Sequence, residues 1–371
     1  MALARRRAAV RPAGAAGRAR RVCYVGDMVR TVIVGDIHGC YDELVQLLDV
    51  AGVRDEDLLI SVGDVVDRGP NPLAVIELFR ARPNSLVLMG NHERKHVREV
   101  FSYAQHITRL QLGERYGECV TWMKTLPYYH ETPEVRVVHA AVVPGVPLAE
   151  QDEDVLAGTT SGDHKLAARV PTGYWHEHYR DAVPIVFGHH VVGREPMVTA
   201  RRVYGIDTGA CHGGRLTALS IPDFHVYAVD ARADYWALAK SAWQVPVLQT
   251  RPWMTMTWTD FDAEIARFKG STRGGAAEYV SALDGWAAAL RGRCDAMVAA
   301  ARAIVERLLA EVGAEGFTAA ARSHPVGPLL FQARSGRLDH AAMVRACTTP
   351  SKTLALARGL ELAVDDPPMT R

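Results

Sequence analysis

Buried-strand patterns alternate with helical patterns from about residue 29 onward. Three short runs of aliphatic residues are each followed by a segment whose apolar residues recur at three- and four-residue steps. The expected strands cover residues 30–36, 57–64 and 84–91, and the expected helices cover residues 41–53, 71–81 and 92–105. This βαβαβ order predicts a mostly parallel sheet that is covered by helices.

A second group of apolar runs follows in the next part of the chain. These runs cover residues 134–142, 182–190, 201–210 and 214–231. Their close spacing predicts strands that pack as a second sheet rather than further βαβ units. The polar, glycine-rich segment around residues 144–180 predicts long surface loops with a short helix, where we expect substrate selection to reside.

The composition changes after about residue 242. Residues 242–258 form a connector that contains Trp and Pro, and from residue 276 to 312 apolar residues again recur at helical spacing. That spacing predicts an amphipathic helix or a helical hairpin. We therefore divide the chain into a domain at 29–242 and a linker with a mostly helical subdomain at 243–371. We favour packing of 276–312 inside this subdomain over its alternative, a surface for self-association or partner binding.

The first 28 residues need a separate interpretation. Up to Arg21 this segment is rich in Arg and Ala and has no acidic residue, so it cannot bury enough apolar surface to offset the entropy of ordering. We expect a disordered tail at 1–28, or translation that begins at Met28. A basic arm that binds nucleic acid and a transit peptide are the less favoured alternatives.

The overall composition narrows the class of protein. A net charge of +1 gives the whole molecule no attraction to nucleic acid or anionic membranes, and no apolar run is long enough to span a bilayer. The six cysteines are scattered without a C-x-x-C pair, which argues against a thiolate zinc site and a disulfide framework. We expect a cytoplasmic protein.

Potential metal ligands follow one predicted strand after another. The segments are "GDIHG" at 35–39, "GDVVDRG" at 63–69, "GNHE" at 90–93, "VHA" at 138–140 and "GHH" at 188–190. The carboxyl ends of the strands in an open α/β sheet are where a ligand crevice forms. Each segment alone is an ordinary turn or a buried histidine, but the ordered set predicts a metal site.

These motifs resemble the calcineurin-like metallophosphoesterases, and more narrowly their phosphoprotein-phosphatase branch, with the pattern GDxHG, GDxVDRG, GNHE, His, His. The resemblance covers about residues 29–232 and extends through "IDTGACHGGRLTAL" at 206–219. It implies a four-layer α/β/β/α sandwich, here with a C-terminal helical extension. It also implies two divalent metal ions at the strand ends, for which Mn²⁺ is favoured and Fe or Zn²⁺ are alternatives.

The resemblance also implies roles for individual residues. The implied metal ligands are Asp36 and His38 for the first ion, Asp64 as the bridge, and Asn91, His139 and His189 for the second ion. His92 would protonate the leaving oxygen, Asp67 would orient His92, and Arg68 would bind the phosphate oxygens. Glu93 is expected to form a structural salt bridge.

Several positions depart from the family pattern or lack an assigned role. Ala140 replaces a usual glycine, His190 adds an imidazole of unknown role, and Asp207 is expected to orient a neighbouring strand or ligand. His212 is expected to have no direct role. No second phosphate-binding arginine is identified by motif, and Arg94 and Arg194 are the candidates.

The sequence predicts a phosphoesterase and leaves its substrate open. The branch motif favours Ser/Thr phosphoproteins, hydrolysed by a metal-activated water. "GDIHGCYDEL" and "IDTGACHGGRLTAL" also resemble symmetrical diadenosine tetraphosphate hydrolases. Together with "DARADYWA" at 230–237 they resemble the phosphatase module of bacterial RNA-repair proteins, which implies RNA ends or 2′,3′-cyclic phosphates. A non-catalytic scaffold is the remote alternative, and the intact motifs argue against it.

Overall fold

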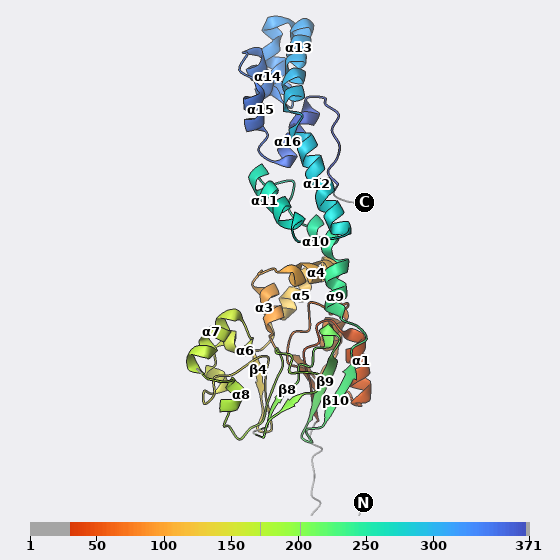
Figure 1. Cartoon of the computed structure of the whole chain (residues 1–371), viewed down its shortest axis with the longest axis vertical. Helices are drawn as coiled ribbons and strands as arrows, with labels where there is room; N and C mark the ends of the chain where they lie inside the picture. Colours follow the sequence, from red (N-terminus) through yellow and green to blue (C-terminus); the bar gives the residue numbers. More distant parts are fainter. Residues whose placement is uncertain (1–29, 171, 201, 369–371) are drawn as a thin grey trace, which may run out of the picture.

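The computed structural model of the chain describes residues 30–170, 172–200 and 202–368. Figure 1 shows an elongated molecule, with both sheets at one end and a stack of helices that leads away from them. The predictions made for residues 1–28 lie outside the described residues.

The first sheet contains the three strands of the βαβαβ pattern. Its order is β10-β9-β1-β2-β3, and β1, β2 and β3 run parallel. The strand bounds are β1 Thr31–Val34, β2 Leu58–Ser61, β3 Ser85–Val87, β9 Arg215–Ile221 and β10 Val226–Asp230. Helices α1 (Tyr41–Val50) and α2 (Pro72–Ala81) connect the parallel strands, as the sequence predicts.

The second sheet contains only part of the later group of strands. Its order is β4-β5-β6-β8-β7, with β5, β6 and β8 parallel. The bounds are β4 Tyr129–Glu131, β5 Arg136–Val138, β6 Ile185–Phe187, β7 Met197–Val198 and β8 Val203–Gly205. The prediction that 214–231 belongs to this sheet is wrong. Strand β9 is buried on both faces and pairs antiparallel with the edge of β1 that β2 leaves open.

The two sheets pack face to face, and helices cover both outer faces. Ile33 on β1 contacts the cluster between the sheets, together with Val137 on β5 and Val186 on β6. Val32 and Val34, on the other face of β1, pack with α1 and α2. Because side chains alternate along a strand, this division gives the α/β/β/α layering that the family resemblance implies.

The outer layer on the second sheet contains more helix than the sequence predicts. Residues 144–180 were expected to be long loops with a short helix. They form a 3₁₀ turn, η2, and three short helices, with bounds η2 Leu148–Glu150, α6 Glu153–Leu156, α7 Thr160–Arg169 and α8 Trp175–His178. Val155, Leu156 and Trp175 are buried against Val138 and Phe187 of the sheet. This apolar anchoring holds the short helices in place.

The single helix expected at 92–105 is two helices. They are α3 (Asn91–Val97) and α4 (Tyr103–Leu112), and Ser102 caps α4 together with Gln105. The chain then continues through η1 (Gly113–Arg115) and α5 (Tyr116–Met123), and η3 (Ala210–His212) precedes β9. Because of this break, α3 can begin within the "GNHE" motif while α4 takes a separate direction and packs against α9 (Tyr235–Ala242) and α10 (Gln244–Gln249).

The helical region begins with two helices that contact the sheet-containing part. Ala239 on α9 and Val247 on α10 are buried against Ile107 on α4. The helix bounds are α9 Tyr235–Ala242, α10 Gln244–Gln249, α11 Trp258–Lys269, α12 Gly275–Arg291, α13 Cys294–Ser323, α14 Gly327–Arg334, α15 His340–Ala346 and α16 Pro350–Gly359. Helix α13 is interrupted at Gly313, which has a φ of 71°.

Residues 276–312 form α12 and the first part of α13, which follow one another along the stack of helices (Figure 1), because Gly292 and Arg293 between them keep helical backbone angles. The segment therefore forms consecutive helices rather than a hairpin, the second of its two predicted forms. Tyr279 and Leu283 are buried in one cluster of the helical region, and Met297 and Ile304 in another. Self-association or partner binding through this segment stays a prediction. Among the residues that the structure describes, no helix combines the length and apolar character needed to cross a membrane.

We predict that Trp253→Ala destabilises the helical region. Trp253 is 0% exposed, its indole Nε1 donates a hydrogen bond to the Leu248 carbonyl at 2.7 Å, and its ring packs against Phe261 and Phe268. The cavity and the lost hydrogen bond should lower the free energy of unfolding of the helical region by about 3–5 kcal/mol, as measured by urea denaturation. The control is Leu238→Ala at a 59% exposed position, which should change it by less than about 0.5 kcal/mol. Equal effects of the two variants would contradict this account of the core.

Candidate active site

The carboxyl ends of five parallel strands bring the predicted ligands to one edge. Asp36 and His38 follow β1, Asp64 follows β2, and Asn91 begins the helix after β3. His139 and His189 come directly after β5 and β6 of the second sheet. The six predicted ligands therefore reach one place from both sheets.

The backbone is strained at this edge. Nine non-glycine residues of the described chain have positive φ, and five of them are predicted site residues. They are His38 (48°), Asp64 (51°), Asp67 (67°), Arg68 (68°) and His189 (68°). Each such conformation costs about 1 kcal/mol or more and persists only where the surrounding structure holds it. The clustering supports the prediction that this edge is the functional site.

Asp64 lies at the centre of two groups of metal-binding side chains. One group contains Asp64 with His38 and His92, and the other contains Asp64 with His139 and His189. Its Oδ2 lies 3.7 Å from His38 Nε2, and its Oδ1 lies 3.5 Å from His139 Nε2. This is the position that a bridging ligand requires.

Asn91 and Asp36 join these groups through direct contacts. The Asn91 Oδ1 lies 3.2 Å from a ring nitrogen of both His139 and His189. The Asp36 carboxylate accepts a hydrogen bond from the His189 amide at 3.0 Å. The structure thus brings all six predicted metal ligands together, and their roles as ligands stay predictions.

The electrostatics of the cluster fit divalent cations. Burial, with Asp207 and Asp64 nearby, raises the pKa of the Asp36 carboxyl well above its usual value. Burial lowers the pKa of His38 and of His139, and that of His189 to about 3, so these rings are neutral at neutral pH, as the predicted ligand role requires. Crowded carboxylates beside neutral imidazoles form a donor set that a pair of cations stabilises. When bound, two divalent cations supply charge for the phosphoryl oxygens and lower the pKa of water.

Asp67 fixes the ring of His92 through a hydrogen bond to Nδ1. Its Oδ2 lies 2.6 Å from His92 Nδ1, and its Oδ1 lies 2.9 Å from Nε2 of His96. Gln105 on α4 also donates a hydrogen bond to Asp67. Despite its burial, the pKa of Asp67 is well below its usual value because His92 and His96 donate hydrogen bonds to it. The ionised Asp67 can therefore orient His92, whose Nε2 faces Asp64 Oδ2 at 3.9 Å.

His96 and Gln105 are site residues that sequence reasoning missed. His96 lies one helical turn after His92, so the spacing of the two histidines was a usable signal. Gln105 carried no such signal, because its contact with Asp67 depends on how α4 packs.

The prediction of a structural salt bridge for Glu93 is wrong. Its carboxylate accepts hydrogen bonds from the backbone N–H groups of Asp64 (2.9 Å), Val65 (2.8 Å), Val66 (3.3 Å) and Gly90 (3.1 Å). Burial, with the Asp64 charge nearby, raises the pKa of Glu93 to about 8. Among the described residues its partners are backbone amides and no cationic side chain, because the strained loop after β2 has N–H groups to satisfy.

The arginines near the site have different surroundings. Arg68 lies with its Nη1 3.0 Å from His38 Nε2, so its guanidinium is at the ligand cluster. Arg94 is buried and bonded to Asp154 and to the Tyr128 hydroxyl, and Arg194 is exposed and paired with Asp230 at 2.7 Å. Neither candidate for the second phosphate-binding arginine has an unpaired guanidinium.

The remaining residues singled out by sequence have local roles. Asp207 accepts a hydrogen bond from the Gly209 amide at 3.0 Å and so fixes the turn after β8. The His190 ring lies next to that of His189, with ring centroids 4.4 Å apart, and faces a cavity beside the ligand cluster.

The fold and the site define a metal-dependent phosphoesterase. The chain belongs to the calcineurin-like phosphoesterase family, whose model matches residues 29–207. It is 32% identical to bis(5′-nucleosyl)-tetraphosphatase PrpE (asymmetrical) of Halalkalibacterium halodurans, over 54% of this chain and 93% of the relative. It is 30% identical to the protein of the same name from Bacillus thuringiensis, over 53% and 92%. A solved metallophosphoesterase from Sphaerobacter thermophilus is 19% identical, with a TM-score of 0.36 over 58% of this chain and 93% of that one.

We predict that Asp64→Asn removes metal from the protein. The change keeps the side-chain size but removes the charge that both donor groups share. After dialysis, elemental analysis should find fewer than one ion per chain, against about two in the unchanged protein. Asp49→Asn, at an exposed position on α1, is the matched control and should keep both ions. Full metal content in Asp64→Asn would contradict the bridging role.

We predict that His92→Asn keeps both metal ions and loses turnover. Loss of the proton donor should lower kcat for an aryl phosphate by roughly 10²- to 10⁴-fold. The same preparation is analysed for metal content, because His92 also lies within one of the two donor groups. Metal loss in step with activity would make His92 a ligand and overturn its assignment as the acid.

Proposed function

We propose that the chain hydrolyses bis(5′-nucleosyl) tetraphosphates, with unequal division of the four phosphates. In this reaction, water adds to one phosphorus and the bridging oxygen leaves with the other product, taking up a proton. The names of the relatives support this class of substrate. The observation that carries the proposal is a cavity that fits a nucleoside beside the ligand cluster.

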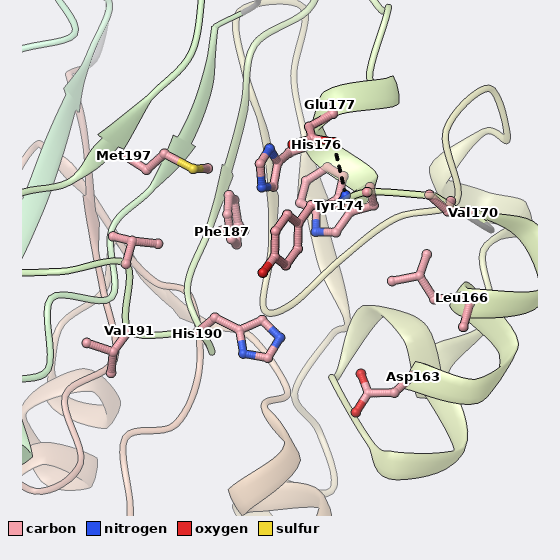
Figure 2. A pocket seen from close by; sticks show the side chains of 14 residues that line it. Asp163, Leu166, Val170, Tyr174, His176, Glu177, Phe187, His190, Val191 and Met197 are labelled. Atoms are coloured by element: carbon pink, nitrogen blue, oxygen red, sulfur yellow. Dashed lines mark hydrogen bonds between the residues drawn. The ribbon is translucent and has the colours of Figure 1, made fainter.

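The cavity has a volume of about 690 Å³ and opens beside His190 (Figure 2). Cavities of roughly 300–1,000 Å³ are the usual size for small-molecule ligands. Its walls come from α7, the segment that contains α8, and the chain around β6 and β7. Since His190 follows His189, a ligand in the cavity has its phosphate end at the predicted metal ligands.

Aromatic rings line one wall of this cavity. The Tyr174 ring stacks on His176 with centroids 5.5 Å apart and planes within 5°, and His176 lies nearly parallel to Phe187. Tyr174 is 70% exposed, and Figure 2 shows its ring toward the open space. Aromatic faces of this kind stack on nucleobases. A phosphorylated serine or threonine has no group that would use this wall.

The side chains of the cluster have separate tasks in the proposed reaction. Arg68 binds the phosphate oxygens with its planar guanidinium. His92 gives its Nε2 proton to the leaving oxygen, and Asp67 keeps the ring in the tautomer and orientation that this transfer requires. Mn²⁺ is the favoured metal, with Fe or Zn²⁺ as alternatives, because the donor set mixes carboxylate, amide and imidazole.

A panel of substrates tests the proposed function. With Mn²⁺, kcat/KM for diadenosine tetraphosphate should exceed that for a phosphoserine peptide, an RNA 3′-phosphate and a nucleotide 2′,3′-cyclic phosphate. The products should be AMP and ATP rather than two molecules of ADP. A preference for the phosphopeptide would support the branch motif instead and overturn the proposal.

Tyr174→Ala tests the role of the aromatic wall. Loss of stacking should raise KM for diadenosine tetraphosphate roughly tenfold. Tyr174→Phe keeps the ring and is the matched control, with KM close to that of the unchanged enzyme. Inhibition by inorganic phosphate, which has no base, should be the same in all three proteins. An unchanged KM in Tyr174→Ala would exclude this wall as the base site.

A further inference from the structure

A smaller cavity of about 310 Å³ lies on another side of the ligand cluster. Asn91, a predicted metal ligand, forms part of its wall. Gly158 lines it as well and lies against His189, since a Cβ at Gly158 would be only 2.7 Å from His189 Cε1. The cavity therefore begins at the residues that are predicted to hold the second metal ion.

Three basic residues of α3 and its end share a face with Asn91. Arg94, Lys95 and Arg98 follow Asn91 by three, four and seven residues, and all four line the cavity. Residues at these steps lie on one side of a helix. The helix that presents a metal ligand thus presents a row of cations from the same face.

Two of these cations are unpaired. Among the described residues, Lys95 and Arg98 make no ion pair and no side-chain hydrogen bond. The acidic residue in the wall, Asp154, is already bonded to Arg94 and lies 2.8 Å from Lys165 Nζ. The cavity therefore keeps a net positive charge with free donors.

Helix α7 adds hydroxyl groups to the lining of this cavity and also lines the aromatic one. Thr160 and Ser161 in the first turn of α7 line the small cavity, and Asp163 and Leu166 further along α7 line the aromatic cavity. None of the described residues that line the small cavity is aromatic, and its volume is less than half that of the other. Its chemistry suits anionic oxygens rather than a nucleobase.

We propose that this cavity binds the phosphates beyond the one that is attacked, so that Lys95 and Arg98 select a polyphosphate chain over a single phosphate. The proposal rests on the proposed function. It places the triphosphate group of the leaving nucleoside triphosphate in the cavity beside α3. The nucleoside monophosphate then lies between the aromatic cavity and the ligand cluster. Each cation binds a phosphate oxygen through a charge-assisted hydrogen bond.

Inorganic tripolyphosphate and orthophosphate test this assignment as inhibitors of aryl phosphate hydrolysis, at constant free Mn²⁺. The readout is the ratio of their two inhibition constants, so that a change in the catalytic rate cancels. Tripolyphosphate should bind more tightly to the unchanged enzyme. In Lys95→Ala/Arg98→Ala the ratio of the orthophosphate inhibition constant to the tripolyphosphate inhibition constant should fall roughly five- to tenfold, as expected for the loss of two partly exposed charge contacts.

Matched variants separate the local effect from net charge and folding. Lys124→Ala/Arg345→Ala removes the same charge at exposed positions elsewhere and should keep the ratio of the unchanged enzyme. Lys95→Gln/Arg98→Gln keeps polar side chains of similar reach and should lose the advantage as well. An unchanged ratio in both Lys95/Arg98 variants, or an equal loss in the control, overturns the proposal.

The KM for diadenosine tetraphosphate distinguishes this proposal from the proposed function. It should rise in the two Lys95/Arg98 variants and stay constant in the control. If the unchanged enzyme does not hydrolyse this dinucleotide, the proposed function fails whatever the tripolyphosphate ratio shows. If it does, and KM is the same in all variants, only the assignment of the cavity fails.

Discussion

The Glu93 carboxylate fixes the position of Asp64, and the rest of the site depends on this contact. The carboxylate accepts hydrogen bonds from the backbone N–H groups of residues 64–66 and of Gly90, and so connects the loop after β2 with the loop after β3. A Cβ at Gly90 would lie 2.1 Å from Asp64 Oδ1, which shows how closely the two loops approach. This clamp holds Asp64 at a positive φ, where its carboxylate faces histidines from both sheets.

The sequence predicts that the candidate ligands meet at one edge because each of them comes within a few residues of the end of a strand. Parallel strands end at one edge, so the order of "GDIHG", "GDVVDRG" and "GNHE" is enough to bring Asp36, Asp64 and Asn91 together. The contacts of Gln105 and Glu93 could not be predicted in this way. Both depend on how loops and helices pack, and neither leaves a periodic signal in the chain.

Some features of the fold also could not be predicted from the sequence, because they depend on packing. Periodicity predicts the first three strands, but it cannot show which sheet takes β9, because a strand that is buried on both faces fits either one. The segment 144–180 looks like loops since its helices are short and only a few apolar residues, such as Leu156 and Trp175, anchor them. This segment supplies walls to both cavities beside the ligand cluster, so the proposed binding of the substrate depends on the part of the domain that was hardest to predict.

We infer that Asp64 bridges two metal ions that residues from both sheets hold. The most direct measurement is an anomalous difference map from crystals that contain Mn²⁺. The map should show two peaks about 3.5–4 Å apart, with Asp64 in contact with both. Asp36 and His38 should contact one peak, and Asn91, His139 and His189 the other. A single peak, or two peaks of which one does not contact Asp64, would contradict this inference.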